Sequence, residues 1–79
     1  MTLKTSEKEW ADAARRFIKA ELKRAEVTYA ELAERLKSHG LQETEASIAS
    51  KLNRGTFAAT FFLATLTALG RQTLSLDDV

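Results

Sequence analysis

The stretch "VTYAELAERLKSHGLQETEASIASKLNRG", residues 27–55, predicts two short helices joined by a turn. Thr28, followed three residues later by Glu31, has the spacing of a capping box, so the first helix is expected to begin there. Gly40 suits the left-handed position that ends a helix. Thr44 is a second N-cap candidate, and the helix that it opens runs to the glycine that closes the stretch. This order of helix, turn and helix decides the fold class.

A longer helix is expected before this stretch. Ser6 and Glu9 have capping-box spacing, and apolar residues then recur at helical intervals up to residue 25. They are Trp10, Ala14, Phe17, Ile18, Leu22 and Ala25. One face of this helix is therefore expected to pack on the core.

A fourth helix is expected after the stretch, with Thr56 as its N-cap and residues 57–69 as its body. It is apolar nearly all round, which favours a helix buried on every side. We expect the centre of the core to come from Phe57, Phe61, Phe62, Leu63, Leu66 and Leu69. The tail, residues 71–79, alternates polar and apolar residues, so a short strand, a docked arm and a disordered end all stay open.

Together these elements predict an all-α protein, a compact four-helix bundle with a fifth element if the tail is ordered. The 79 residues allow one domain, residues 1–79, with a helix-turn-helix at about 28–55 and a C-terminal arm at 71–79. The start "MTLKTSEKEW" lacks the apolar region of a signal peptide. The apolar run at 57–69 is too short to span a bilayer, so we expect no membrane association and a cytoplasmic protein.

Composition argues against enzyme chemistry. The chain has no Cys and a single His, which excludes thiolate and histidine-rich metal sites. No glycine-rich loop that would cradle a phosphate is present, and no set of nucleophile and base stands out. We therefore expect no catalytic residue, no cofactor, no metal and no small-molecule substrate.

The charge pattern locates any positive field in the first helix. The formal net charge is only +1, which is low for a domain that binds nucleic acid. Lys and Arg outnumber Asp and Glu by seven to five in residues 1–27, whereas the two kinds are equal, four and four, in residues 28–55. The basic face of the first helix comprises Arg15, Arg16, Lys19, Lys23 and Arg24.

Three segments, "VTYAELAERL", "SIASKLNRG" and "FFLATLTALG", resemble in their order the helix-turn-helix domains of the phage-repressor-like (XRE) type. The turn "KSHGLQETE" is longer than the tight turn typical of those domains. A closer resemblance, over nearly the whole chain, is to a small bacterial family known only as a domain of unknown function. It rests on "VTYAELA", "ETEASIASKLNRGTFAATFFL" and "ALG".

The repressor-like resemblance implies binding of double-stranded DNA, with the third helix in the major groove and the second on the backbone. The residues expected to contact DNA are Tyr29, Thr44, Glu45, Ser47, Ser50, Lys51, Arg54, Thr56, Arg15 and Lys19. Lys51 is the strongest candidate for a base or phosphate contact. Tyr29 is either a phosphate-binding hydroxyl or a half-buried ring. The Ser, Lys and Arg side chains are also explained by helix capping and by the helix dipole alone.

The function expected is that of a small transcriptional regulator, acting as a homodimer. The three phenylalanines of the fourth helix exceed what a small monomer hides, and Trp10 is expected either in the core or at the dimer contact. The alternative is a protein-interaction or oligomerisation module that uses the same scaffold without DNA. The two differ in electrostatics: DNA binding is favoured if the outward face of the third helix joins the basic face of the first helix. The interaction module is favoured if Glu34, Glu43 and Glu45 make that face acidic.

Overall fold

The computed structural model describes residues 4–79 and confirms the all-α prediction, because it contains helices and no strand within this range. The elements are α1 (Glu7–Ala25), α2 (Tyr29–Lys37), α3 (Glu45–Arg54), α4 (Ala59–Ala68) and a 3-10 turn, η1 (Leu76–Asp78). Residues 1–3, which belong to the predicted domain and to the segment judged not to be a signal peptide, lie outside the described residues. No helix within the described part is long and apolar enough to cross a membrane.

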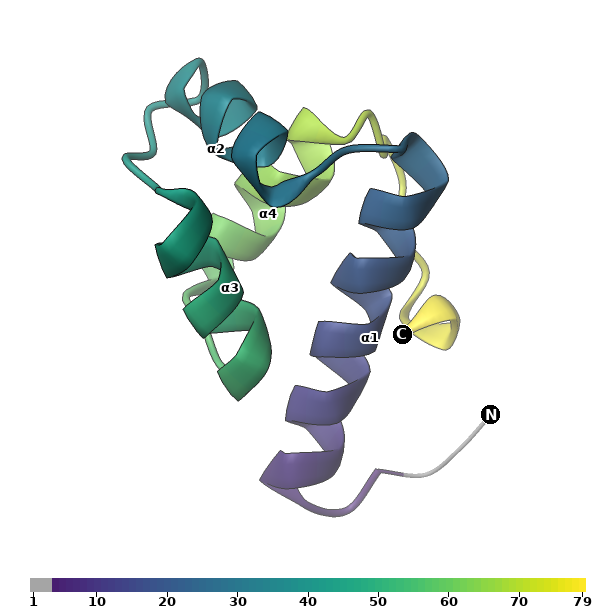
Figure 1. The fold of residues 1–79 in the computed structure, drawn as a ribbon. Helices are drawn as coiled ribbons and strands as arrows, with labels where there is room; N and C mark the ends of the chain where they lie inside the picture. The colour runs from purple at the N-terminus through teal and green to yellow at the C-terminus, as the bar shows by residue number, and fades with distance from the viewer. Residues whose placement is uncertain (1–3) are drawn as a thin grey trace.

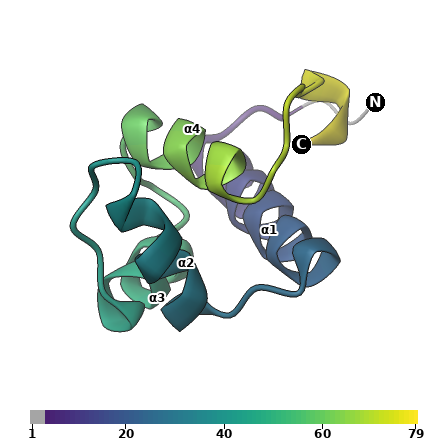
Figure 2. The same cartoon turned by 90° about the horizontal axis from the view of Figure 1, so that it is seen from above.

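The three short helices gather on one side of the long α1 (Figure 1). α2 packs on both α3 and α4, and α3 also packs on α1. The chain that follows α4 turns back over α1, as the view from above shows (Figure 2). Its end is held to the start of the described chain, where Lys4 Nζ donates a hydrogen bond to the carbonyl oxygen of Val79 at 3.0 Å.

The core lies where these helices meet. Its most deeply buried side chains come from all four helices and are Ile18, Leu32, Leu36, Ile48, Leu52 and Phe61. Each of these residues lies four positions from another buried residue of its own helix. The apolar periodicity of the sequence therefore correctly identified the inward faces of α1, α2 and α3. The hydrophobic effect of burying this cluster holds the four helices together.

The helix boundaries of the central stretch are confirmed in detail. Thr28 accepts from the backbone N–H of Glu31 at 3.1 Å and Glu31 accepts from the N–H of Thr28 at 3.0 Å, which completes the capping box of α2. Thr44 and Ser47 form the corresponding box of α3, at 3.0 and 2.9 Å. Gly40 has φ +84°, as expected of the left-handed position after a helix.

The predicted fourth helix differs from the observed α4 in two respects. It begins at Ala59 with Ala58 as N-cap, so Thr56 is not a cap, because residue 58 is still extended (ψ 148°). It is also not buried on every side. Phe61, Thr65 and Leu66 are buried, but Leu63, predicted in the core, is 61% exposed. The physical reason is that one face of α4 meets α2 and the core, and no residue of the described part, 4–79, covers Leu63 on the other face.

The tail is a docked arm, the second of the three alternatives that the sequence left open. Arg71 holds the tail to α1, because its Nη1 donates to Glu21 Oε2 at 2.8 Å. Its Nη2 donates to Asp78 Oδ2 at 2.6 Å, which links the start of the tail to its end. Ser75 caps η1 by accepting from the N–H of Asp77 at 3.2 Å. Ion pairs therefore hold the arm, rather than a strand ladder.

Candidate nucleic-acid interface and apolar hollow

α3 presents an exposed face that could reach a ligand. Ala46, Ser50 and Asn53 lie at positions i, i+4 and i+7 and are all exposed, with Glu45 and Arg54 beside them. The opposite face carries Ile48 and Leu52, which are fully buried. Because the buried face fixes the rotation of the helix, these exposed residues are the ones that any partner of α3 would meet.

The N-terminal end of α3 is occupied by its own capping. The hydroxyl oxygen of Thr44 accepts a hydrogen bond from the backbone N–H of Ser47. Ser47 Oγ accepts from the N–H of Thr44 and donates to Glu43 Oε1 at 2.6 Å. Thr44 and Ser47, both predicted to contact DNA, therefore already have intramolecular partners. Glu45, in the first turn, is exposed, where its charge favours the helix dipole.

Lys51, the strongest predicted contact, is half-buried rather than projecting outward. Its ammonium donates to both carboxylate oxygens of Glu43, at 2.8 and 2.9 Å, and lies 5.4 Å from the centre of the Phe61 ring. Burial alone would raise the pKa of Glu43, but hydrogen bonds from Lys51 and Ser47 outweigh it, and the pKa is lowered. Lys51 thus joins the turn before α3 to the body of that helix.

The C-terminal end of α3 meets α1 closely. Arg15 Nη1 donates to the carbonyl oxygen of Asn53 at 3.3 Å, where a cation also suits the helix dipole. Gly55 is buried against the backbone of Ala11, and a Cβ atom on it would lie 2.5 Å from the Ala11 carbonyl oxygen. Arg54 is exposed and donates to Ser50 Oγ at 3.0 Å.

A stripe of basic residues runs along α1 from this junction. At 3.6 residues per turn the stripe covers about 100° of the helix surface. It comprises Lys8, Arg15, Arg16, Lys19 and Lys23, together with Asp12. Asp12 pairs with Lys8 at 3.1 Å and with Arg15 at 2.6 Å. Within residues 4–79, Arg16, Lys19 and Lys23 form no ion pair, so their charges are available to solvent.

The predicted contact residues therefore divide into separate groups. Arg15 and Arg54 lie at the junction of α1 with the end of α3, and Lys19 lies about one turn further along α1. Ser50 lies on the exposed face of α3, whereas Thr44, Glu45, Ser47 and Lys51 belong to the capped end or to the ion pair described above. The ring of Tyr29 is half-buried against the core. Thr56 lies on a different surface, at the apolar hollow described below.

Two kinds of residue were missed when contacts were predicted from the sequence. Asn53 is exposed on the same face as Ser50, and the spacing i, i+4, i+7 from Ala46 contained that signal. Arg16 and Lys23 were recognised as basic but were not chosen as contacts. Their signal was the common helical face that they share with Lys19.

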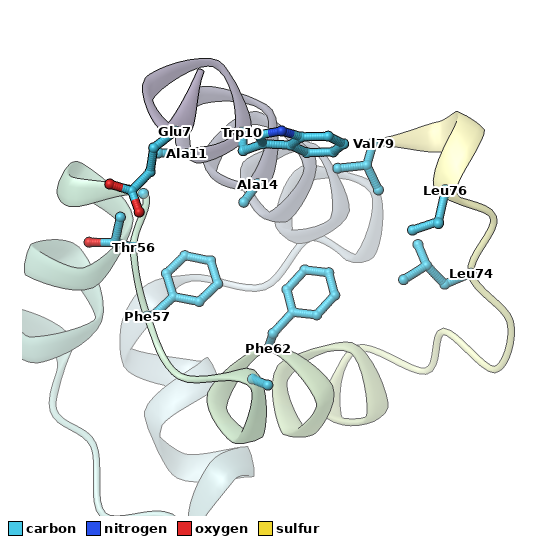
Figure 3. A pocket seen from close by; sticks show the side chains of 12 residues that line it. Glu7, Trp10, Ala11, Ala14, Thr56, Phe57, Phe62, Leu74, Leu76 and Val79 are labelled. Carbon is cyan, nitrogen blue, oxygen red and sulfur yellow. The ribbon is translucent and has the colours of Figure 1, made fainter. Parts of the chain in front are cut away.

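Thr56 lies at an open apolar hollow of about 500 Å³, on the side of the molecule that the arm covers (Figure 3). Side chains from α1, from the connection before α4, from α4 and from the arm meet there. They include Trp10, Ala14, Phe57, Phe62, Leu74 and Leu76. Phe57 and Phe62 stack with ring centres 6.2 Å apart and form the floor. Trp10 is 55% exposed and Leu76 81% exposed, so Trp10 is not part of the core.

The arm forms one wall of this hollow because Arg71 holds it. Arg71 pairs with Glu21, which is only 5% exposed and also accepts two hydrogen bonds from Arg24, at 3.1 and 2.9 Å. The Arg24 hydrogen bond, with the charge of Arg71, lowers the pKa of Glu21 below its ordinary value of 4.5 despite its burial. This network of ion pairs therefore fixes the position of the arm, and with it the positions of Leu74 and Leu76.

Comparison with known proteins gives a family but no activity. Residues 10–74 match a family described as a domain of unknown function (DUF6471), in agreement with the closer of the two resemblances. The matched segment holds α2, α3 and α4 and all of α1 from Trp10 onward. No curated protein and no solved structure matches the chain. Within the described residues, no group of His, Cys, Asp and Glu is arranged to hold a metal ion.

Proposed function

We propose that this chain, which belongs to the DUF6471 family, binds double-stranded DNA as a small regulator. The observation that carries the proposal is the contact of Arg15 with the carbonyl oxygen of Asn53. Through it, the basic stripe of α1 continues into the exposed face of α3. Phosphate neutralisation supplies most non-specific affinity for DNA, and a continuous positive surface beside an exposed helix suits that contact.

The acidic residues that would favour a different function are largely neutralised. Glu34 pairs with Lys37 at 3.0 Å, and Glu43 pairs with Lys51 at 2.8 Å. Glu45 remains as an exposed negative charge at the far end of α3. The balance of charge around the α1–α3 junction is therefore positive, which supports DNA over an acidic protein-binding face.

The proposal assigns different roles along this surface. Lys19, Lys23 and Arg54 contact phosphates, because they are exposed cations to which the described residues offer no acidic partner. Ser50 and Asn53 face the base edges, and Asn is suited to paired hydrogen bonds with adenine. Lys51 does not read DNA but keeps the turn before α3 in place.

The test is fluorescence anisotropy with labelled random duplex DNA, titrated from low to physiological salt. Three phosphate contacts would give a slope of log K against log salt concentration of about −2.7. Lys19→Ala should make this slope shallower by about 1. Lys37→Ala is the matched control, because it also removes an exposed lysine charge, but from α2.

Two outcomes would reject the proposal. One is the absence of binding at low salt by a protein shown to be helical. The other is an equal effect of Lys19→Ala and Lys37→Ala, since net charge rather than a surface would then control binding. Arg54→Ala and Lys51→Ala are to be measured separately. Arg54→Ala should weaken DNA binding, whereas Lys51→Ala leaves the mostly buried Glu43 unpaired and should chiefly lower stability.

A second candidate function, protein interaction without DNA, is favoured by one observation. The hollow exposes Trp10 and Leu76 on a surface where, of the described lining residues, Glu7 is the one with a charged side chain. Apolar side chains of this size on the surface are typical of protein contacts. The same anisotropy titration separates the two functions, because an apolar contact of this kind gives no DNA binding at low salt.

A further inference from the structure

The described chain exposes four large apolar side chains. They are Trp10, Leu63, Leu74 and Leu76. Three of them line the hollow, and Leu63 follows Phe62, another lining residue, on the open face of α4. We call these four residues together with the hollow the α4–arm surface. The basic stripe of α1 is not part of it, so DNA bound to that stripe would leave these side chains in water.

The size of the α4–arm surface is compatible with a weak protein contact. Trp10 exposes about half of its roughly 200 Å², and Leu63 and Leu76 each expose on the order of 100 Å². Two such surfaces would bury roughly 600 Å² from these side chains alone. With the surrounding backbone and polar rim, the pair approaches the lower end of specific interfaces, about 1,200 Å² in total.

We propose that the occupant of this surface is a second copy of the same chain, related by a two-fold axis. A two-fold interface must be complementary to itself, because the same patch is used on both sides. This surface has both parts: a hollow of about 500 Å³ and, in the wall that the arm forms, a leucine that is 81% exposed. Leu76 of each copy enters the hollow of the other and packs on Trp10 and Phe62.

The charges at the rim agree with this pairing. Glu7 is the charged residue among those that line the hollow. Lys4 lies at the Trp10 side of the same rim, with its ammonium 5.1 Å from the centre of the indole ring. In a two-fold pair, Glu7 of one copy can face Lys4 of the other, and the contact is made twice. One acid and one base at the rim therefore favour a second copy over a strongly charged partner.

The pairing goes beyond DNA binding and requires no DNA, so its test is carried out without DNA. Sedimentation equilibrium of the full chain from micromolar to millimolar concentration should show a reversible monomer–dimer equilibrium. Trp10 is the single tryptophan, so its emission should shift to the blue as the dimer forms. Leu76→Glu should raise the dissociation constant by about tenfold or more, because each dimer would bury two carboxylates.

The controls separate self-association from folding and from DNA binding. Leu63→Glu, at the edge of the surface, should also weaken the dimer, and both residues are exposed, so circular dichroism should show unchanged helix content. Ala46→Glu adds the same charge on the exposed face of α3 and should leave the dimer intact while it lowers DNA affinity. A wild-type chain that stays monomeric at millimolar concentration would overturn the pairing and leave the surface to a different protein or an apolar small molecule. Equal dimerisation of Leu76→Glu and wild type would overturn it as well.

Discussion

Replacement of Gly55 by alanine should destabilise the protein far more than the same change at Gly40. Both glycines have a positive φ, +71° at Gly55 and +84° at Gly40, so both variants carry the strain of a left-handed alanine. That strain is roughly 1–2 kcal/mol, and the lower entropy of the unfolded alanine variant offsets part of it equally at both positions. The comparison between the two variants therefore isolates what surrounds each glycine.

The surroundings differ sharply. A Cβ atom on Gly40 would have no atom within 4 Å, whereas one on Gly55 would lie 2.5 Å from the carbonyl oxygen and 2.9 Å from the carbonyl carbon of Ala11. These are backbone atoms, so no side-chain rotation relieves the overlap, and α1 must move away from the end of α3. Overpacking of this kind costs about 1–3 kcal/mol. We expect the Gly55→Ala variant to be less stable than Gly40→Ala by that amount.

The assay is urea unfolding of both variants and the wild type, followed by circular dichroism and supported by thermal melts. For a domain of this size the difference corresponds to a melting temperature lower by roughly 5–20 °C in Gly55→Ala than in Gly40→Ala. Gly70→Ala is a second control, because its φ is +79° and its Cβ atom would also meet nothing within 4 Å. If Gly55→Ala unfolds together with these two variants, the close approach of α1 to α3 is not a determinant of stability, and the argument is refuted.

Three further outcomes follow from buried or strained groups. Thr65→Val should raise the free energy of unfolding in urea by about 1 kcal/mol, because the buried Thr65 hydroxyl oxygen has no hydrogen-bond partner among residues 4–79. Glu26→Gly should raise the free energy of unfolding by about 0.5–1 kcal/mol, since Glu26 ends α1 with φ +56°; a loss would contradict this. The lowered pKa of Glu21 means that its ion pairs contribute above its ordinary value of 4.5, so stability should fall as the pH drops below about 4.5. Unfolding measured from neutral to acid pH should show a shallower acid decline for Glu21→Gln, and identical profiles would exclude this role.

Part of the candidate site could be predicted from the sequence, because it depends on helical spacing alone. The exposed face of α3 that carries Ser50, and the basic face of α1 that carries Lys19, are both set by a period of 3.6 residues. The fate of Lys51 could not be predicted in this way. Its partner Glu43 is eight residues away and lies in a turn, so their contact depends on how that turn folds back.

The apolar hollow was beyond prediction for a similar reason. Trp10, Phe62 and Leu76 stand far apart in the chain and meet only once the arm is docked through Arg71. Helical periodicity indicates that a residue is on an apolar face but does not say whether another element covers that face. The sequence therefore favoured a core position for Leu63, and the structure leaves it open to solvent.

The sequence by itself determined where α1, α2 and α3 begin and where α2 and α3 end. These boundaries follow from hydrogen bonds between residues a few positions apart, such as those of Thr28 with Glu31 and of Thr44 with Ser47, and from glycines that accept a positive φ. Only the tertiary structure decided which charges are free, which apolar residues are exposed and where α4 starts. Those properties depend on the angles at which helices dock and on contacts between distant residues, and short-range spacing carries no information about either.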